Sequence, residues 1–330
     1  MILLTNNPYD RKLVMAVGKV PNRILKRSVV NLLKCPPRTG IDAASFAVGD
    51  IHVLTACATG LTDCAIAPET AVYKAANNIW VSGGELLGIE ASFMLPKSYN
   101  EYNLKAYTKR VKAACDKCKT TLAGGHTEVT DGVKRFCISV AATGIAGTTP
   151  VNIHNVKPGM DIIVTKWIAL EEAAMIVSNE DNMAKLCEHF SNEYMSVTGQ
   201  YADWLTVRDE AAVAMKHGVA AMHDISEGGI FTALWDFAEG SGCGFEVDLK
   251  RIPLRQETVE IAEFFHLNPY TMKSSGSIII ACDNGTDMVN ALNEEGIPAV
   301  IIGSILSGYT HIFIRKVQND TCGRAYGSNG

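Results

Sequence analysis

The most informative stretch of the sequence is Gly124-Gly125-His126-Thr127-Glu128-Val129-Thr130-Asp131-Gly132. Paired glycines let the backbone approach a ligand closely and leave their N–H groups open to an anion. A hydroxyl and a carboxylate follow at Thr127 and Glu128. Because Mg²⁺ prefers oxygen ligands and phosphates, this grouping is suited to holding a metal and a phosphate together. The alternative is a tight turn between two strands, with Glu128 in solvent.

A second glycine-rich stretch reads His223-Asp224-Ile225-Ser226-Glu227-Gly228-Gly229 and precedes a predicted helix over residues 228–239. The N-terminus of a helix attracts an anion, and glycines there allow close approach. The alternative is that Asp224 or Ser226 is only the N-cap of this helix, a common role for such residues.

Two further stretches are weaker candidates. Gly40-Ile41-Asp42-Ala43-Ala44 places one acid in a loop of small residues, and Ala76-Asn77-Asn78-Ile79 places two amides inside a predicted helix. Buried amides on a helix usually satisfy neighbouring polar groups in the core. Neither stretch predicts a binding site by itself.

Several common motifs are absent from the sequence. There is no dinucleotide fingerprint and no Walker phosphate loop, so any ATP must be bound without the standard loop. The ten cysteines are too sparse for a disulfide scaffold. Cys115 and Cys118 form one close pair without a matching second pair, which argues against a structural zinc site and favours reduced thiols.

The composition is that of a globular protein. Of the 330 residues, 47% are hydrophobic and 20% charged, and the net charge of −5 provides no basic field for a nucleic-acid backbone. No apolar run reaches the roughly 18 residues that span a bilayer. The apolar start, Met-Ile-Leu-Leu, is too short for a signal-peptide core. We expect a cytoplasmic protein with no nucleic-acid or membrane partner.

Hydrophobic patterning predicts a mixed α/β chain of two domains, 1–147 and 148–330, joined at Gly147-Thr148-Thr149-Pro150. A strand–helix–strand unit closes the second domain. The predicted strands are 52–55, 91–95, 135–145, 161–165, 277–282 and 299–303, and the predicted helices are 69–82, 101–119, 170–177, 193–216, 228–239 and 287–295.

Taken in order, these stretches resemble the AIR synthase (PurM-like) superfamily, and within it the branch of the hydrogenase maturation factor HypE. The resemblance covers most of the chain, from Gly18 to Ile305. The resemblance implies an α+β N-terminal domain that pairs with its copy in a homodimeric β-barrel, and an α/β C-terminal domain that closes over it. The segments that carry it are Gly18-Lys19-Val20-Pro21, residues 124–131, 157–176 and 222–229, and Ser274-Ser275-Gly276-Ser277.

The resemblance also implies ATP and Mg²⁺ as cofactors, bound at the dimer interface. Asp42 and Glu128 are then expected to hold the metal. The residues expected to contact ATP are Asn77, Asn78, Gly124, Gly125, His126, Thr127, Asp224, Glu227, Gly228 and Gly229.

The sequence departs from the family pattern at several acidic positions. Ile41 stands beside Asp42 where the family commonly has a second acid, Cys57 stands where it has the aspartate of a Thr-Asp pair, and Asn78 where it has the aspartate of Asn-Asp. A thiol is a poor Mg²⁺ ligand, and an amide carries no charge. Weakened or lost catalysis is therefore one prediction.

The C-terminus departs as well. HypE ends in the cysteine that carries the group being dehydrated, whereas Cys322 is followed by eight more residues. Cys322 either takes part in the reaction or is a free surface thiol.

Three functions remain open. The leading hypothesis is HypE-like, ATP-dependent activation of a small carbonyl or thiocarbamate substrate, with a small molecule or a maturation protein as partner. The second is a small-molecule kinase of the α-ribazole kinase type. The third is a degenerate protein that binds nucleotide without turnover.

Overall fold

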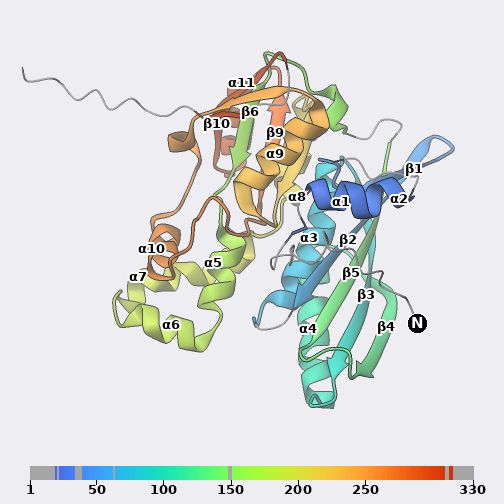
Figure 1. Cartoon of the computed structure of the whole chain (residues 1–330), viewed down its shortest axis with the longest axis vertical. Helices are drawn as coiled ribbons and strands as arrows, with labels where there is room; N and C mark the ends of the chain where they lie inside the picture. Colours follow the sequence, from blue (N-terminus) through green and yellow to red (C-terminus); the bar gives the residue numbers. More distant parts are fainter. Residues whose placement is uncertain are drawn as a thin grey trace, which may run out of the picture.

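The computed structural model describes residues 19–20, 22–33, 39–61, 64–147, 151–308 and 312–314. Two β-sheets with flanking helices form, one before residue 148 and one after residue 150, which confirms the mixed α/β class (Figure 1). We call these regions the N-terminal part and the C-terminal part. Gly18, Pro21, residues 148–150 of the predicted linker and Cys322 lie outside the described residues.

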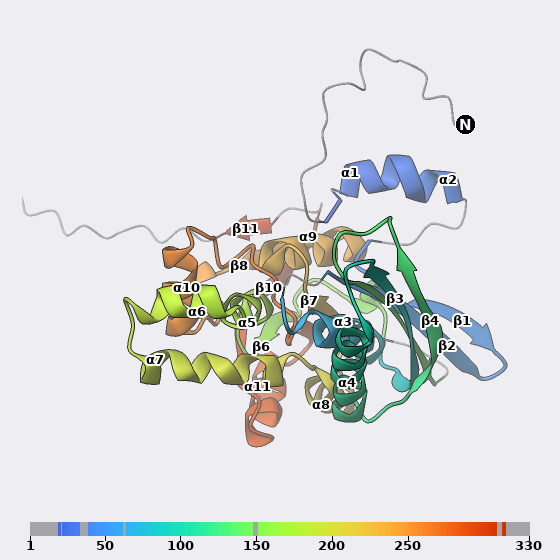
Figure 2. The ribbon, with the colours of Figure 1, turned by 90° about the horizontal axis from the view of Figure 1, so that it is seen from below.

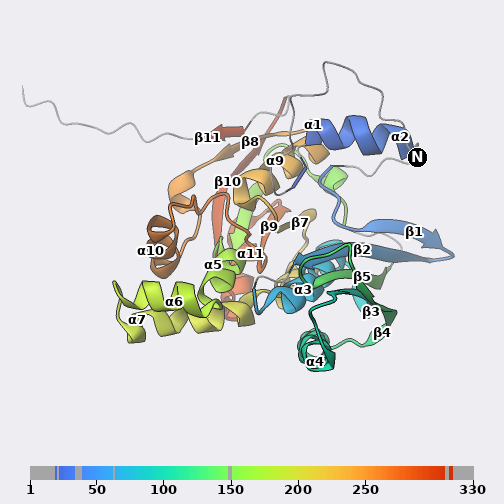
Figure 3. The same ribbon diagram turned by 60° about the horizontal axis from the view of Figure 1, so that its bottom comes forward.

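The sheet of the N-terminal part has the strand order β1-β2-β5-β3-β4. Neighbours are antiparallel except β3 and β4, which run parallel. The hairpin of β1 and β2 projects from the body of the molecule (Figure 3). The bounds are β1 Ala44–Val48, β2 Ile51–Leu61, β3 Glu85–Pro96, β4 Leu122–Thr130 and β5 Cys137–Ala146.

Helices α3 (Ala67–Val81) and α4 (Glu101–Lys117) cover one face of this sheet (Figure 2). Helix α4 starts at a capping box in which Asn100 and Asn103 bond each other's backbone N–H. Along β5, buried residues alternate with half-buried ones, so only one face of the strand enters the core. The opposite face, with most of β4, stays open in the described part of the chain.

The sheet of the C-terminal part has the order β11-β8-β10-β6-β9-β7. Strands β7 and β9 are buried along their whole length, which the apolar run of β9 explains, whereas β7 also buries His223 and Asp224. Strand β6 lies between β9 and β10 and is antiparallel to both. The bounds are β6 Asp161–Thr165, β7 Ala221–Ile225, β8 Gly244–Val247, β9 Ser277–Cys282, β10 Ala299–Leu306 and β11 Ile312–Ile314.

Helix α11 packs against β6, β9 and β10 of this second sheet, and α9 packs against β7. Its buried residues, among them Ile230, Leu234 and Phe237, join an apolar core with the sheet. The remaining bounds are α1 Asn22–Leu25, η1 Lys26–Val30, α2 Asn31–Leu33, η2 Ile153–Asn155, α5 Leu170–Val177, α6 Glu180–Cys187, α7 Asn192–Ser196, η3 Val197–Trp204, α8 Arg208–Lys216, α9 Gly229–Ser241, η4 Leu249–Arg251, α10 Gln256–Phe264 and α11 Gly285–Glu294.

One predicted helix is wrong. Residues 193–216 form α7, η3 and α8, with a non-helical link between η3 and α8. Asn77 holds this link from another helix, donating to the carbonyl of Leu205 and accepting from the N–H of Val207. A contact between residues 130 positions apart thus overrides the local helical pattern. None of the helices in the described ranges is long and apolar enough to cross a membrane.

Candidate functional site

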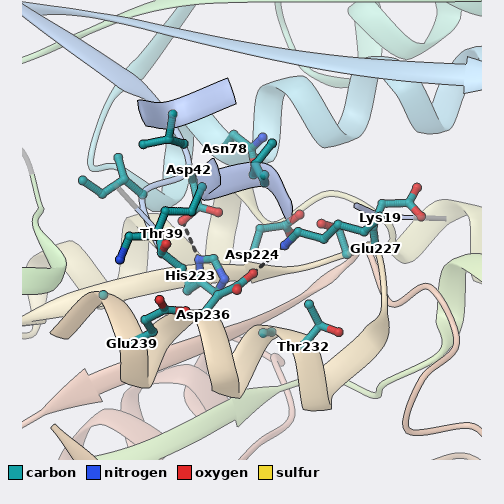
Figure 4. A pocket seen from close by; sticks show the side chains of 18 of the residues that line it. Lys19, Thr39, Asp42, Asn78, His223, Asp224, Glu227, Thr232, Asp236 and Glu239 are labelled. Atoms are coloured by element: carbon teal, nitrogen blue, oxygen red, sulfur yellow. Dashed lines mark hydrogen bonds and ion pairs between the residues drawn. The ribbon is translucent and has the colours of Figure 1, made fainter. Parts of the chain in front are cut away.

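A cavity of about 560 Å³ lies where the N-terminal segment, helix α3 and the β7–α9 region meet (Figure 4). Asp42 and Asn78 reach it from the N-terminal part, and Asp224 and Asp236 from the C-terminal part. Its full lining is Lys19, Leu25, Lys26, Val30, Thr39, Gly40, Ile41, Asp42, Asn78, His154, His223, Asp224, Ser226, Glu227, Thr232, Ala233, Asp236, Glu239 and Gly240.

Local sequence explains how the C-terminal side of the cavity forms. Strand β7 ends at Ile225, and the chain turns through Gly228 and Gly229, with φ of +82° and +67°, into α9. A Cβ on Gly229 would lie 2.5 Å from the carbonyl oxygen of Tyr270, so only glycine fits there. The geometry of the turn therefore explains why glycine occupies both positions, and neither glycine lines the cavity.

Helix α9 runs along the cavity with a polar face that we did not single out from the sequence. Thr232, Asp236 and Glu239 follow one another at helical spacing and all line the cavity. The sequence does carry a sign of this polar face, because three polar residues at helical spacing interrupt a mostly apolar helix.

Asp224 is the most unusual group in the cavity. It is only 3% exposed, and neither carboxylate oxygen has a hydrogen-bond partner among the described residues. Burial, reinforced by the negative charge of Asp42, raises the pKa of Asp224 to about 7. A buried carboxylate without partners is costly unless a ligand supplies a cation or a donor. Asp224 therefore fits a metal ligand.

Asp42 pairs with His223 across the two parts of the chain. Oδ2 of Asp42 lies 2.8 Å from Nδ1 of His223, and both side chains are about nine-tenths buried. Burial alone would lower the pKa of His223, but the charge of Asp42 outweighs it and raises that pKa. The pair fixes the segment before β1 against β7.

The two lysines of the cavity, Lys19 and Lys26, come from the N-terminal segment. Lys19 forms an ion pair with the buried carboxylate of Asp236, a role that no local sequence pattern indicates. Asp42, Asp224, Glu227, Asp236 and Glu239 make the cavity predominantly acidic. Such a cavity repels a bare triphosphate but attracts a divalent cation or an anion that carries one.

No three His, Cys, Asp or Glu side chains are grouped to hold a metal by themselves within the described ranges. Mg²⁺ does not need such a cage, because it usually binds through one or two carboxylates, water and substrate phosphates. The oxygen donors of the cavity fit this mode of binding.

The first glycine-rich stretch lies elsewhere. Gly124, Gly125, His126, Thr127 and Glu128 are in β4, at the edge of the first sheet, and not in a turn. None of them lines the large cavity. A smaller cavity of about 400 Å³ on the sheet is lined by Glu90, Ala91, Ser92, Gly125, Ser139 and Ala141.

The second glycine of this pair has a packing role. Gly125 has a φ of +154°, and a Cβ there would lie 1.9 Å from the carbonyl oxygen of Ala91 on β3. Gly124 has no such neighbour within 4 Å. His126 and Glu128 lie on the same side of β4, with Nε2 3.2 Å from Oε2.

Of Asn77, Asn78 and Cys57, which were also singled out from the sequence, one lines the large cavity and the others do not. Asn78 lines the large cavity, whereas Asn77 is fully buried and uses both ends of its amide on the backbone of residues 205 and 207. Cys57 is exposed on β2 and pairs in register with Ala141. Within one chain, Asp42 and Glu128 do not share a cavity.

Comparison with known proteins finds two matching family domains. The N-terminal domain of AIR synthase related proteins matches residues 68–146, and the C-terminal domain of the same family matches residues 157–315. A candidate hydrogenase expression/formation protein of Methanocaldococcus jannaschii is 25% identical over 92% of both chains. The carbamoyl dehydratase HypE of Rhizobium leguminosarum is 24% identical over 77% of this chain and 72% of its own.

Solved structures of the same fold include both HypE and ThiL proteins. A HypE–HypF complex superposes with a TM-score of 0.67 at 17% identity, covering 88% of this chain and 94% of that one. HypE in complex with ATP gives 0.64 at 16%, covering 88% of each. ThiL complexed with AMPPCP and TMP gives 0.70 at 18%, covering 92% and 98%. The two matched domains span most of the described residues, and the chain belongs to the AIR synthase related protein family.

Proposed function

We propose that this protein binds ATP with Mg²⁺ in the large cavity and uses it, as a HypE-like protein, to activate a small carbonyl or thiocarbamate substrate. The observation that carries the proposal is Asp224, a buried carboxylate without partners that faces a cavity built by both parts of the chain. The ATP complex of HypE and the dehydratase activity named for the relatives support the same assignment.

In this proposal Asp42 and Asp224 hold the metal, and Asn78 contributes an uncharged oxygen. Mg²⁺ supplies neutralisation of the phosphate charge. Lys26, from the N-terminal segment, attracts the phosphate oxygens that the acidic residues would otherwise repel, whereas Lys19 is already paired with Asp236. Glu227 faces the same cavity and keeps its charge, because the lysines beside it lower its pKa despite burial.

We further propose that the protein is a homodimer in which β4 and the open face of the first sheet contact a second copy. Strand β4 is an exposed edge, and unpaired sheet edges recruit other chains. The second copy then brings Gly124, Gly125, His126, Thr127 and Glu128 to the nucleotide as a group.

Titration calorimetry with ATP and MgCl₂ tests the nucleotide assignment. The wild type is expected to bind ATP only when Mg²⁺ is present, and Asp224→Asn is expected to weaken binding at least tenfold. Asp116→Asn is the matched control, because Asp116 is an exposed acid on helix α4 that is paired with Lys112 and lines neither cavity. Absence of heat from the wild type at millimolar ATP and MgCl₂ overturns the proposal.

A small-molecule kinase is the second candidate. It is favoured by the ThiL complex, which holds a nucleotide analogue in the same fold, and it needs no C-terminal cysteine. Transfer of labelled γ-phosphate to a hydroxyl-bearing substrate identifies a kinase, whereas ATP-dependent dehydration of a carbamoylated protein identifies HypE-like activity. The HypE–HypF complex supports HypF-like proteins as the partners to test first.

A further inference from the structure

Beyond its first turn, helix α3 carries three polar residues, Lys74, Asn77 and Asn78, among apolar ones. They stand at i, i+3 and i+4, so they lie on one side of the helix. That side meets the C-terminal part, because α3 contacts β7 and α8. Asn77 bonds the η3–α8 link and Asn78 lines the large cavity, which leaves the role of Lys74 to be explained.

Lys74 is a nearly buried cation that joins the two parts of the chain. Its side chain is 9% exposed, and Nζ lies 2.8 Å from Oε1 of Glu171 and 2.7 Å from Oε1 of Glu227. Both carboxylates belong to the C-terminal part. Burial alone would lower the pKa of Lys74, but the two carboxylates outweigh it and raise that pKa, so the lysine stays charged.

The partners of Lys74 are themselves held in place. The other oxygen of Glu171, Oε2, accepts a hydrogen bond of 2.8 Å from Ser275, and Glu171 is fully buried. Lys273 approaches Oε1 of Glu227 at 3.4 Å, and the N–H of Ser274 donates to the carbonyl of Ser226. The turn before α9 is therefore tied to α3, to α5 and to the 273–275 segment.

We propose that Lys74 is a positioning residue of the candidate site, which fixes Glu227 and the turn before α9 against helix α3. Lys74 lies one helical turn from Asn78, and Glu227 lies three residues after Asp224. By holding Glu227, Lys74 sets how Asn78 and Asp224, from opposite parts of the chain, face each other across the cavity. This inference rests on the proposed nucleotide site for its functional meaning.

Hydrogen exchange measured without nucleotide is the first test. Lys74→Met removes the cation but leaves the buried carboxylate of Glu171 without its ion-pair partner. The test therefore also uses the double variant Lys74→Met with Glu171→Gln, which removes that buried charge. In both variants the amides of residues 225–232 are expected to exchange at least tenfold faster, while α4 and α11 keep wild-type rates. Lys97→Met is the matched control, since it removes an exposed lysine paired with Asp131.

Titration with ATP and MgCl₂, well below the melting temperature, is the second test. A purely structural role would lower the melting temperature without changing the affinity of the folded protein. We expect about tenfold weaker binding for the double variant and no change for Lys97→Met.

Unchanged exchange in residues 225–232 of a folded double variant overturns the inference, as does faster exchange with wild-type affinity. A wild type that binds no ATP overturns the proposed function instead, because the exchange experiment involves no nucleotide.

Discussion

Nδ1 of His223 lies 2.8 Å from Oδ2 of Asp42, although the two residues are 181 positions apart in the sequence. The contact joins the segment before β1 to a fully buried strand of the other sheet, at the edge of the candidate site. It makes the site dependent on how the two parts of the chain are held together.

Replacing His223 by Phe is expected to destabilise the protein by about 3 kcal/mol at pH 5.5, because Asp42 loses its buried partner. The pKa of His223 is raised in the folded state. The stability from this pair is therefore fully present below the unfolded pKa of about 6.5 and is lost as pH rises through the folded pKa. Urea unfolding of the wild type and of His223→Phe at pH 5.5 and at pH 9 measures how much stability the substitution costs at each pH. An equal loss at the two pH values contradicts the prediction.

Asp224→Asn is expected to stabilise the protein while it weakens ATP binding. Burial raises the pKa of Asp224 from its ordinary value of 3.8 to about 7 in the folded state, so the wild type loses stability as pH rises between these values. The gain from Asn should be about 2–3 kcal/mol larger at pH 8 than at pH 5. Thermal unfolding across this range tests the prediction, with Asp131→Asn expected to show no pH-dependent gain.

The two glycines of β4 are expected to respond differently to alanine. Gly125→Ala places a Cβ against the carbonyl of Ala91 and should cost about 3 kcal/mol, because the β3–β4 pairing must open. Gly124→Ala meets no atom within 4 Å and should change stability little. If Gly124 lines phosphate in the dimer, its variant stays folded but binds ATP more weakly. Denaturant unfolding and calorimetry on the same samples separate the two effects.

Asn77 is expected to contribute mainly to the stability of the fold, and Asn78 mainly to ATP binding. Asn77→Ala leaves the carbonyl of Leu205 and the N–H of Val207 unpaired, at a cost of about 2–4 kcal/mol. Asn78→Ala should leave stability nearly unchanged and weaken ATP binding. Asn78→Asp adds a charged oxygen ligand and should tighten Mg²⁺-dependent binding. The prediction is wrong if Asn77→Ala proves the more damaging to ATP affinity.

A large charged residue on the open sheet face is expected to break the proposed dimer. Ser139→Arg places a guanidinium beside the smaller cavity, and we expect a monomer by light scattering together with at least tenfold weaker ATP binding. Thr108→Arg, on exposed helix α4, serves as the control. A wild type that is already monomeric, yet binds ATP, contradicts the shared site.

Local patterns predicted much of the fold. The predicted ranges 161–165, 170–177 and 277–282 match β6, α5 and β9, because continuous apolar runs and helical spacing are strong local signals. The last strand–helix–strand unit also forms, as β9, α11 and β10. That β6 enters between its two strands could not be predicted, since strand order depends on contacts distant in sequence.

The candidate site was predictable only in part. Asp42, Asn78, Asp224 and Glu227 line one cavity, whereas Glu128 and residues 124–127, which the resemblance groups with them, do not. A turn between two strands was the alternative for the 124–132 stretch, because glycines favour turns, but residues 124–130 pair in parallel with β3 and belong to strand β4.

The ion pair of Lys19 with Asp236 joins positions 217 apart, so no local pattern could predict it.

The span between Asp42 and His223 also has a consequence during synthesis. At roughly 5–20 residues per second, the ribosome needs about 10–40 s to make the 181 positions that separate them. Strand β5 completes the N-terminal sheet only at Ala146, so for the later part of that time the sheet exists while Lys74 and Asn77 lack partners that are still to be made, among them Leu205 and Glu227. Ribosome-bound chains that stop before β7 thus present a surface that the finished protein hides, where a chaperone has time to act.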